Sequence, residues 1–176
     1  MPKFNAYNIA DITSRDDVDP ALNPGEVISW YSGATDGYKT FQYVKFDNGA
    51  GNVAAANGAL AYWKDQDAYT VTSDLSDAIG AGDGWRRNMV AGVFLGVPTD
   101  ARYTFIQIGG RHSAVLTNAD DDILAGDALI AATTDSDVDS VTAGTAPTYR
   151  VVGYALAADV DANDTVDTLL VLDYRQ

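Results

Sequence analysis

Aspartate supplies almost all of the acidic residues in this 176-residue chain. Of the 25 acidic residues, Glu26 is the only glutamate, and the chain contains only four lysines. Glutamate and lysine are good helix formers that suit solvent-facing helix positions, whereas aspartate bonds to nearby backbone groups and favours caps and turns. The composition therefore argues against a helix-rich fold and indicates strands separated by Asp-rich turns.

Strand-like segments recur along the chain at intervals of roughly 8–12 residues, which is typical of a β-sandwich or β-barrel. In the segment YKTFQYVKF, Phe41 and Tyr43 should lie on one side and Val44 and Phe46 on the other. A single helical turn fits DLSDAIGA. We expect an all-β, mainly antiparallel fold, a compact β-barrel or sandwich-like domain with little helix. The segments are VISWYS, YKTFQYVKF, ALAYWK, YTVTSD, MVAGVFLGV, RYTFIQIGG, HSAVLT, ALIAATT, DSVTA, RVVGYALA and TLLVLDY.

The first 26 residues differ from the rest of the chain. The stretch NIADITSRDDVDPALNPGE mixes acids and prolines with a few apolar residues and has no sustained period. We interpret residues 1–26 as an extended N-terminal arm and residues 27–176 as a single domain. Phe4, Tyr7 and Ile9 give the arm apolar surface and are predicted contacts with a partner or with the arm's own domain. A frayed terminus is the alternative.

The net charge is −14 and the isoelectric point is about 4.1. Such a surface repels phosphate backbones and anionic lipids, so we expect neither direct nucleic-acid binding nor membrane binding. After His112, Arg150 is the only basic residue before the C-terminal Arg175. Trp85, Arg86 and Arg87 in the WRRN stretch are therefore predicted partner contacts, with a plain solvated loop as the alternative.

The stretch DVDANDTVD has acids at alternate positions. Asp159, Asp161 and Asn163 occupy the first, third and fifth positions of a calcium-loop pattern. The pattern then fails, because Asp164 stands where glycine is needed and Leu170 stands where a bidentate glutamate belongs. We expect a turn in which these side chains cap the backbone. Weak calcium binding by the same oxygens is the alternative.

Motifs for catalysis or nucleotide binding are incomplete. The stretch GAGNVA at residues 49–54 fits a dinucleotide pattern, but too few residues separate it from Asp65 for a crossover helix and a second strand. Here we expect a turn. His112 is the only histidine, and its neighbour Ser113 should point to the opposite face of a strand. The chain also has no cysteine, so the sequence predicts no catalytic residue and no cofactor.

Several motifs, taken in order, resemble those of the small capsid decoration, or cement, proteins of tailed bacteriophages. A strand of the form V-AGV-LG is followed by a Tyr-x-x-Ile-Gln segment, an AGD-L turn, a loop with paired valines, a VGYAL strand and a last apolar strand. The resemblance covers about residues 41–173 and leaves out the arm. In this chain the motifs lie at Ala91–Val97, Tyr103–Gln107, Ala125–Leu129, Val138–Gly144, Val152–Leu156 and Leu169–Leu172, and the stretch Val44–Trp63 also resembles the middle section of the family.

Two of these motifs have a structural explanation that does not depend on the resemblance, namely the AGD turn and the VGYAL strand. Gly126 and Asp127 should form a tight turn that the aspartate caps. Gly153 should allow a bend or a close backbone approach within a strand. Neither motif performs chemistry, so both are expected to shape the domain.

The resemblance implies a structural protein on the virion, located on the capsid exterior and made in the host cytoplasm. Its partners would be the major capsid protein and further copies of itself, most commonly as a homotrimer, and it would staple neighbouring capsid subunits. The alternative is a carbohydrate-binding or adhesin-like β module, because Trp30, Trp63, Trp85 and ten tyrosines could form stacking surfaces.

Overall fold

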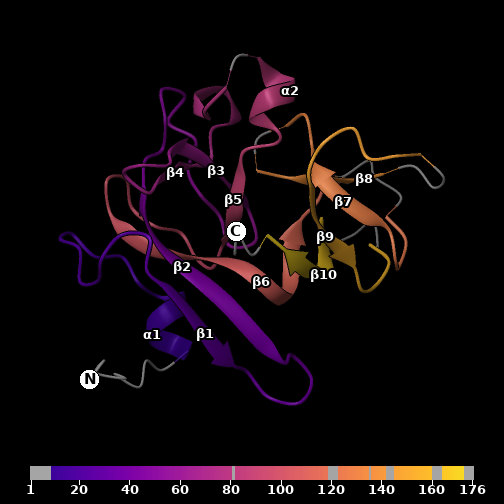
Figure 1. Cartoon of the computed structure of the whole chain (residues 1–176), viewed down its shortest axis with the longest axis horizontal. Coiled ribbons are helices and arrows are strands. Elements are labelled where there is room, and N and C mark those ends of the chain that lie inside the picture. The colour runs from indigo at the N-terminus through magenta and orange to yellow at the C-terminus, as the bar shows by residue number, and fades with distance from the viewer. Residues whose placement is uncertain are drawn as a thin grey trace.

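A computed structural model describes residues 9–80, 82–118, 123–134, 136–141, 145–159 and 164–172 (Figure 1). Within these ranges the chain forms ten strands and three short helical segments. The helical segments are α1 (Ile9–Thr13), the 3₁₀ turn η1 (Leu75–Asp77) and α2 (Asp83–Arg86). The strands are β1 (Val27–Tyr31), β2 (Tyr38–Phe46), β3 (Leu60–Asp65), β4 (Thr70–Thr72), β5 (Val90–Phe94), β6 (Tyr103–Leu116), β7 (Ala128–Ala131), β8 (Val138–Ser140), β9 (Val151–Ala155) and β10 (Thr165–Val171).

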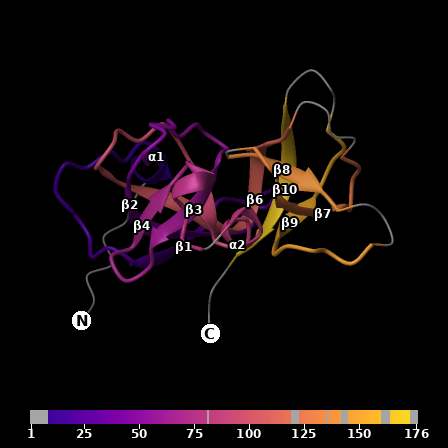
Figure 2. The same ribbon diagram turned by 90° about the horizontal axis from the view of Figure 1, so that it is seen from above.

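The strands follow the order β1-β2-β4-β3-β5-β6-β10-β9-β7-β8, and β2 also pairs with β6. The pairing of β2 with β4 is parallel, and the other strand pairings are antiparallel. Strands β2, β4, β3, β5 and β6 thus close a ring, while β1 extends it on one side and β10, β9, β7 and β8 form a second lobe (Figure 2). The predicted all-β, mainly antiparallel fold is confirmed, and it is sandwich-like rather than one closed barrel.

Strand β2 separates two hydrophobic cores. Phe41 and Tyr43 are buried in a smaller core with Ile12 and Phe105. Val44 and Phe46 face the main core, which continues into the second lobe. The predicted alternation along this strand is confirmed. Both faces are covered here because the chain before β1 packs over the Phe41 side.

The described part of the predicted arm lies along its own domain and includes α1. Ile12 is 1% exposed, and the backbone of Asp17 pairs with that of Tyr103 through hydrogen bonds of 2.9 Å in both directions. The hydroxyl of Tyr43 donates to Asp17 Oδ2 at 2.6 Å. These contacts hold the segment before β1 on the surface of β2 and β6.

Aspartate side chains accept hydrogen bonds from backbone amides at many turns, as the composition predicted. Asp74 shows the pattern most fully: its carboxylate accepts from the amides of Gly51 and Ser76, at 2.9 Å each, and the residue is 2% exposed. Burial alone would raise the pKa of Asp74, but the bonds from Ser76 and Gly51 outweigh it and lower that pKa. The GAGNVA stretch is thereby a turn tied to η1, and the predicted turn is confirmed. Other carboxylates that bond to amides in this way belong to Asp16, Asp47, Asp65, Asp100 and Asp127.

Strand β6 bends at Gly109 and Gly110, where it passes from β2 to β10. Gly109 pairs with Thr40 of β2 and with Val171 of β10. Gly110 has φ +82°, and a Cβ placed there would lie 2.2 Å from the carbonyl oxygen of Tyr38, so only glycine fits. The buried amide of Gln107 donates to the carbonyls of Gly109, Gly110 and Arg111 at 3.0–3.3 Å. The side chain of Gln107 therefore supplies hydrogen bonds at the point where β6 stops pairing with β2 and begins to pair with β10.

We predict that Gln107→Leu lowers the free energy of unfolding by about 2 kcal/mol, because carbonyls in the bend lose their donor. Gln107→Glu should destabilise the protein more, since a carboxylate would face carbonyl oxygens. Urea denaturation followed by tryptophan fluorescence measures both, with the exposed Gln66→Leu as control. Equal stability of Gln107→Leu and the control would show that the amide does not hold the bend.

Candidate partner-contact surface

The WRRN stretch comprises the last two residues of α2 and the two that follow, and together with Tyr149 it forms what we call the Trp85 platform (Trp85, Arg86, Arg87, Asn88 and Tyr149). The side chain of Trp85 is 65% exposed, a high value for a residue of its size. The amide of Trp85 donates to the carbonyl of Gly82 at 3.1 Å, and the amide of Asn88 donates to the carbonyl of Trp85 at 3.0 Å. The backbone on both sides of the indole is thus fixed while the ring projects to solvent.

Arg87 anchors this platform to the second lobe. Its guanidinium donates from Nε to the carbonyl of Ala131 in β7 at 2.6 Å, and Nη2 donates to the same oxygen. The guanidinium carbon lies 4.0 Å from the ring centroid of Tyr149, a cation–π contact. The residue is only 7% exposed. Arg87 therefore joins the helix to segments that follow it by more than forty positions in the sequence.

Asn88 completes the platform. Its Nδ2 donates to the carbonyl of Gly84 at 3.0 Å, and its Oδ1 accepts from the amide of Arg150 at 2.7 Å. The two bonds join the end of α2 to the start of β9. Together with Arg87, they hold Trp85 in place without contacting the indole.

The structure places the predicted contact residues in different environments. Trp85 is exposed and Arg86 is partly buried. Arg87, also a predicted partner contact, is buried, and its guanidinium contacts Ala131 and Tyr149 of the same chain. Phe4 and Tyr7 lie outside the described residues. Ile9 begins α1, but its side chain lies outside them too.

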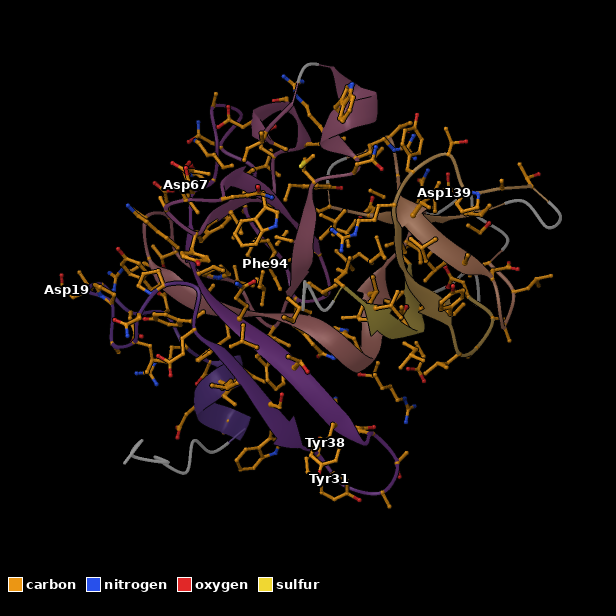
Figure 3. The ribbon with its side chains drawn as sticks, viewed as in Figure 1. Asp19, Tyr31, Tyr38, Asp67, Phe94 and Asp139 are labelled. Atoms are coloured by element: carbon orange, nitrogen blue, oxygen red, sulfur yellow. The ribbon has the colours of Figure 1, made fainter. Side chains whose placement is uncertain are left out.

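A second exposed aromatic group was missed by the sequence reasoning. Tyr31 and Tyr38 face each other across the end of the β1–β2 hairpin, with ring centroids 5.1 Å apart and exposed fractions of 55% and 71% (Figure 3). The sequence does contain a feature that predicts this pair, because a Gly-containing turn separates the two strands and brings the two tyrosines at their ends opposite each other. The connection between Ser32 and Gly37 is closed by an amide-to-carbonyl bond of 2.9 Å.

The predicted calcium-loop residues are only partly described. Asp159 is partly buried, and its Oδ2 accepts from the hydroxyl of Thr117 at 2.6 Å, as expected for a side chain that fixes a turn. Asp161 and Asn163 lie outside the described residues. Among those that the structure describes, no group of three or more acidic or histidine side chains converges on a metal position.

His112 lies in β6 opposite Thr168 and is 6% exposed, whereas its neighbour Ser113 is exposed. The predicted opposite orientation of these two residues is confirmed. Burial, together with the nearby positive charge of Lys39, lowers the pKa of His112 to about 4. Its Nδ1 accepts a 3.3 Å hydrogen bond from the amide of Ala114, so the ring is neutral near pH 7.

Among the helices of the described ranges, none is long and apolar enough to cross a membrane.

We predict that Arg87→Met lowers the free energy of unfolding by about 2–3 kcal/mol, because the Ala131 carbonyl loses charged donors inside the protein. Trp85→Ala should change it by less than about 0.5 kcal/mol, since the indole is already in solvent. Urea denaturation of both variants measures the difference. A loss for Trp85→Ala as large as that for Arg87→Met would contradict the division of roles in the platform.

The stability should also fall on mild acidification. In the unfolded chain His112 takes up a proton below its ordinary pKa of 6.5, while the folded protein resists protonation down to about pH 4. Stability from this residue is thus complete above pH 6.5 and lost as the pH falls to 4, by about 3 kcal/mol. His112→Asn keeps an acceptor for the Ala114 amide, and the melting temperature of this variant should depend less on pH between pH 6.5 and pH 4. Ser113→Ala is the control and should retain the wild-type slope.

Comparison with known proteins places few constraints on this chain. No protein-family model matches the sequence, and no curated protein matches it. One similar solved structure is the N-terminal base of the head fiber protein gp8.5 of bacteriophage phi29. The two share 15% sequence identity, over 83% of this chain and 95% of that one, with a TM-score of 0.46. At this level the similarity assigns neither a family nor a function.

Proposed function

We propose that the chain is a structural protein of a tailed-phage virion that binds the capsid exterior and stabilises the shell by bridging major capsid subunits. One observation supports this most directly. The motifs from Ala91 to Leu172 that resemble capsid decoration proteins fall on β5 to β10, which follow one another in the sequence and form one unbroken run of the sheet, β5-β6-β10-β9-β7-β8. The resemblance therefore concerns one continuous structural unit.

The motif residues have structural reasons to be where they are. Gln107 ends the Tyr-x-x-Ile-Gln segment and holds the bend of β6. Asp127 in the AGD turn accepts from the amide of Leu124 at 2.8 Å, as predicted. A Cβ at Gly153 would lie 2.6 Å from the carbonyl oxygen of Leu169, so the predicted close approach in β9 is confirmed. The shared residues build the scaffold, and the contacts with a shell must come from exposed positions.

Trp85 is the exposed residue best suited to such a contact. Tryptophan and arginine are enriched among residues that dominate binding energy, and a rigid side chain loses little entropy on binding. The platform holds the indole without covering it. A protein that binds only the assembled shell stabilises it by mass action, and several contacts per copy add to the effect.

A carbohydrate-binding module is the second candidate, and the tyrosine pair favours it. Tyr31 and Tyr38 expose two adjacent rings at a hairpin end, an arrangement on which a sugar ring can stack. This candidate places the contact at the hairpin, whereas the capsid proposal places it at α2.

Cosedimentation with expanded shells, built from the major capsid protein encoded with this chain, tests the two candidates. The capsid proposal expects saturable, stoichiometric binding that Trp85→Ala weakens tenfold or more and Tyr38→Ala leaves unchanged. No binding to such shells would contradict it. Glycan binding that is lost in Tyr38→Ala but kept in Trp85→Ala would establish the second candidate instead.

A further inference from the structure

The sheet has two edge strands, β1 and β8, and they differ in how they are protected. Exposed edges invite pairing with other chains, and proteins usually shorten them or place charges on them. Strand β8 has three residues with Asp139 at its centre (Figure 3). Strand β1 has five residues, VISWY, with no charge, proline or bulge. Among the described residues, β2 is its only sheet neighbour.

The backbone of β1 presents hydrogen-bonding groups away from β2. The amide of Tyr43 donates to the carbonyl of Glu26, and the amide of Ser32 donates to the carbonyl of Gly37, both at 2.9 Å. Hydrogen-bonded pairs alternate along an antiparallel ladder, so the backbone amides and carbonyls of Ile28 and Trp30 also point toward β2. The amides and carbonyls of the three residues between these positions therefore point outward. They belong to Val27, Ser29 and Tyr31.

The side chains of the same three residues share one face, and that face is in solvent. Val27 is 46% exposed, Tyr31 is 55% exposed, and Ser29 between them is exposed as well. An added strand would thus gain backbone hydrogen bonds and cover apolar side chains at the same time.

We propose that β1 is the pairing site for β1 of a second copy of this chain. In an antiparallel arrangement with its two-fold axis at Ser29, each Val27 faces Tyr31 of the other copy, and the two Ser29 residues face each other. Each of these facing pairs exchanges two backbone hydrogen bonds, because all three residues point outward. The edge is self-complementary in this register, as a two-fold interface requires.

The distribution of charge favours a second copy of the chain as the partner of β1, and it favours the register centred on Ser29. Two chains of net charge −14 repel each other, and a strand without charged residues is where they can approach at least cost. Glu26 lies just before β1, and in this register it faces Ser32 of the second copy rather than the other Glu26. No like charges are therefore placed opposite each other.

The dimer should be weak. Pairing of two five-residue strands buries less surface than the roughly 1,200 Å² at the lower limit of stable interfaces, so we expect dissociation constants on the order of micromolar or weaker. Salt should strengthen the dimer, because at 1 M it shortens the screening length to about 3 Å and weakens the repulsion between the copies. This inference does not depend on the capsid proposal.

Sedimentation velocity of the full chain at rising concentration, in 0.05 M and 1 M salt (roughly 14 Å and 3 Å screening lengths), provides the test. We expect a reversible monomer–dimer equilibrium that shifts toward dimer with salt. Ser29→Pro removes an outward amide and leaves pairing with β2 intact, so it should abolish the dimer. Ser29→Ala keeps the amide and should dimerise like the wild type. A monomer under all conditions, or dimerisation of Ser29→Pro equal to wild type, would overturn the proposal.

Charge reversal at the two-fold axis tests the register. Ser29→Asp and Ser29→Lys move the net charge in opposite directions, yet each places like charges opposite each other and should prevent self-association. An equimolar mixture of the two variants should restore a dimer, which also shows that both are folded. A mixture that stays monomeric, while the wild type dimerises, would place the interface elsewhere.

Discussion

The architecture depends on one strand that changes partners. Strand β6 pairs with β2 and β5 in its first half and with β10 in its second half, and Gly109 belongs to both ladders. In the sheet order of the described residues, β6 is the strand that joins the ring to the second lobe, so the bend after Gln107 contributes to how the two lobes share the main core. The buried amide of Gln107 donates to successive backbone carbonyls in the bend, and leaving those buried carbonyls without a donor would cost free energy of folding.

The parts of the fold that were predictable from the sequence are those set by local chemistry. Alternation in β2 revealed which residues face each core, and the excess of aspartate over glutamate revealed turns capped by carboxylates such as Asp74 and Asp127. The role of Arg87 was not predictable. Its partners are Ala131 and Tyr149, and no local pattern indicates which carbonyl a basic side chain will reach after folding.

The same limitation applies to the candidate site. A tryptophan beside two arginines suggested a contact surface, and the indole is indeed exposed. The sequence did not reveal that one arginine is buried to support the other residues. Burying a guanidinium is unfavourable unless its charge is well partnered. Here the Ala131 carbonyl and the ring of Tyr149 are the partners of the guanidinium, so the backbone that carries the exposed indole is held in place.

Charge decides where such a molecule can be approached. Several of the described carboxylates bond to backbone amides at turns, and the regions that we consider suited to association carry basic or no charge: the Trp85 platform and the free edge of β1. The two lie at opposite ends of the molecule, with α2 at the top and the β1–β2 hairpin at the bottom of Figure 1. Occupation of one therefore leaves the other accessible. A copy held on a surface through α2 can still offer β1 to a neighbour, and crowding of copies on that surface would populate a pairing too weak to dominate in dilute solution.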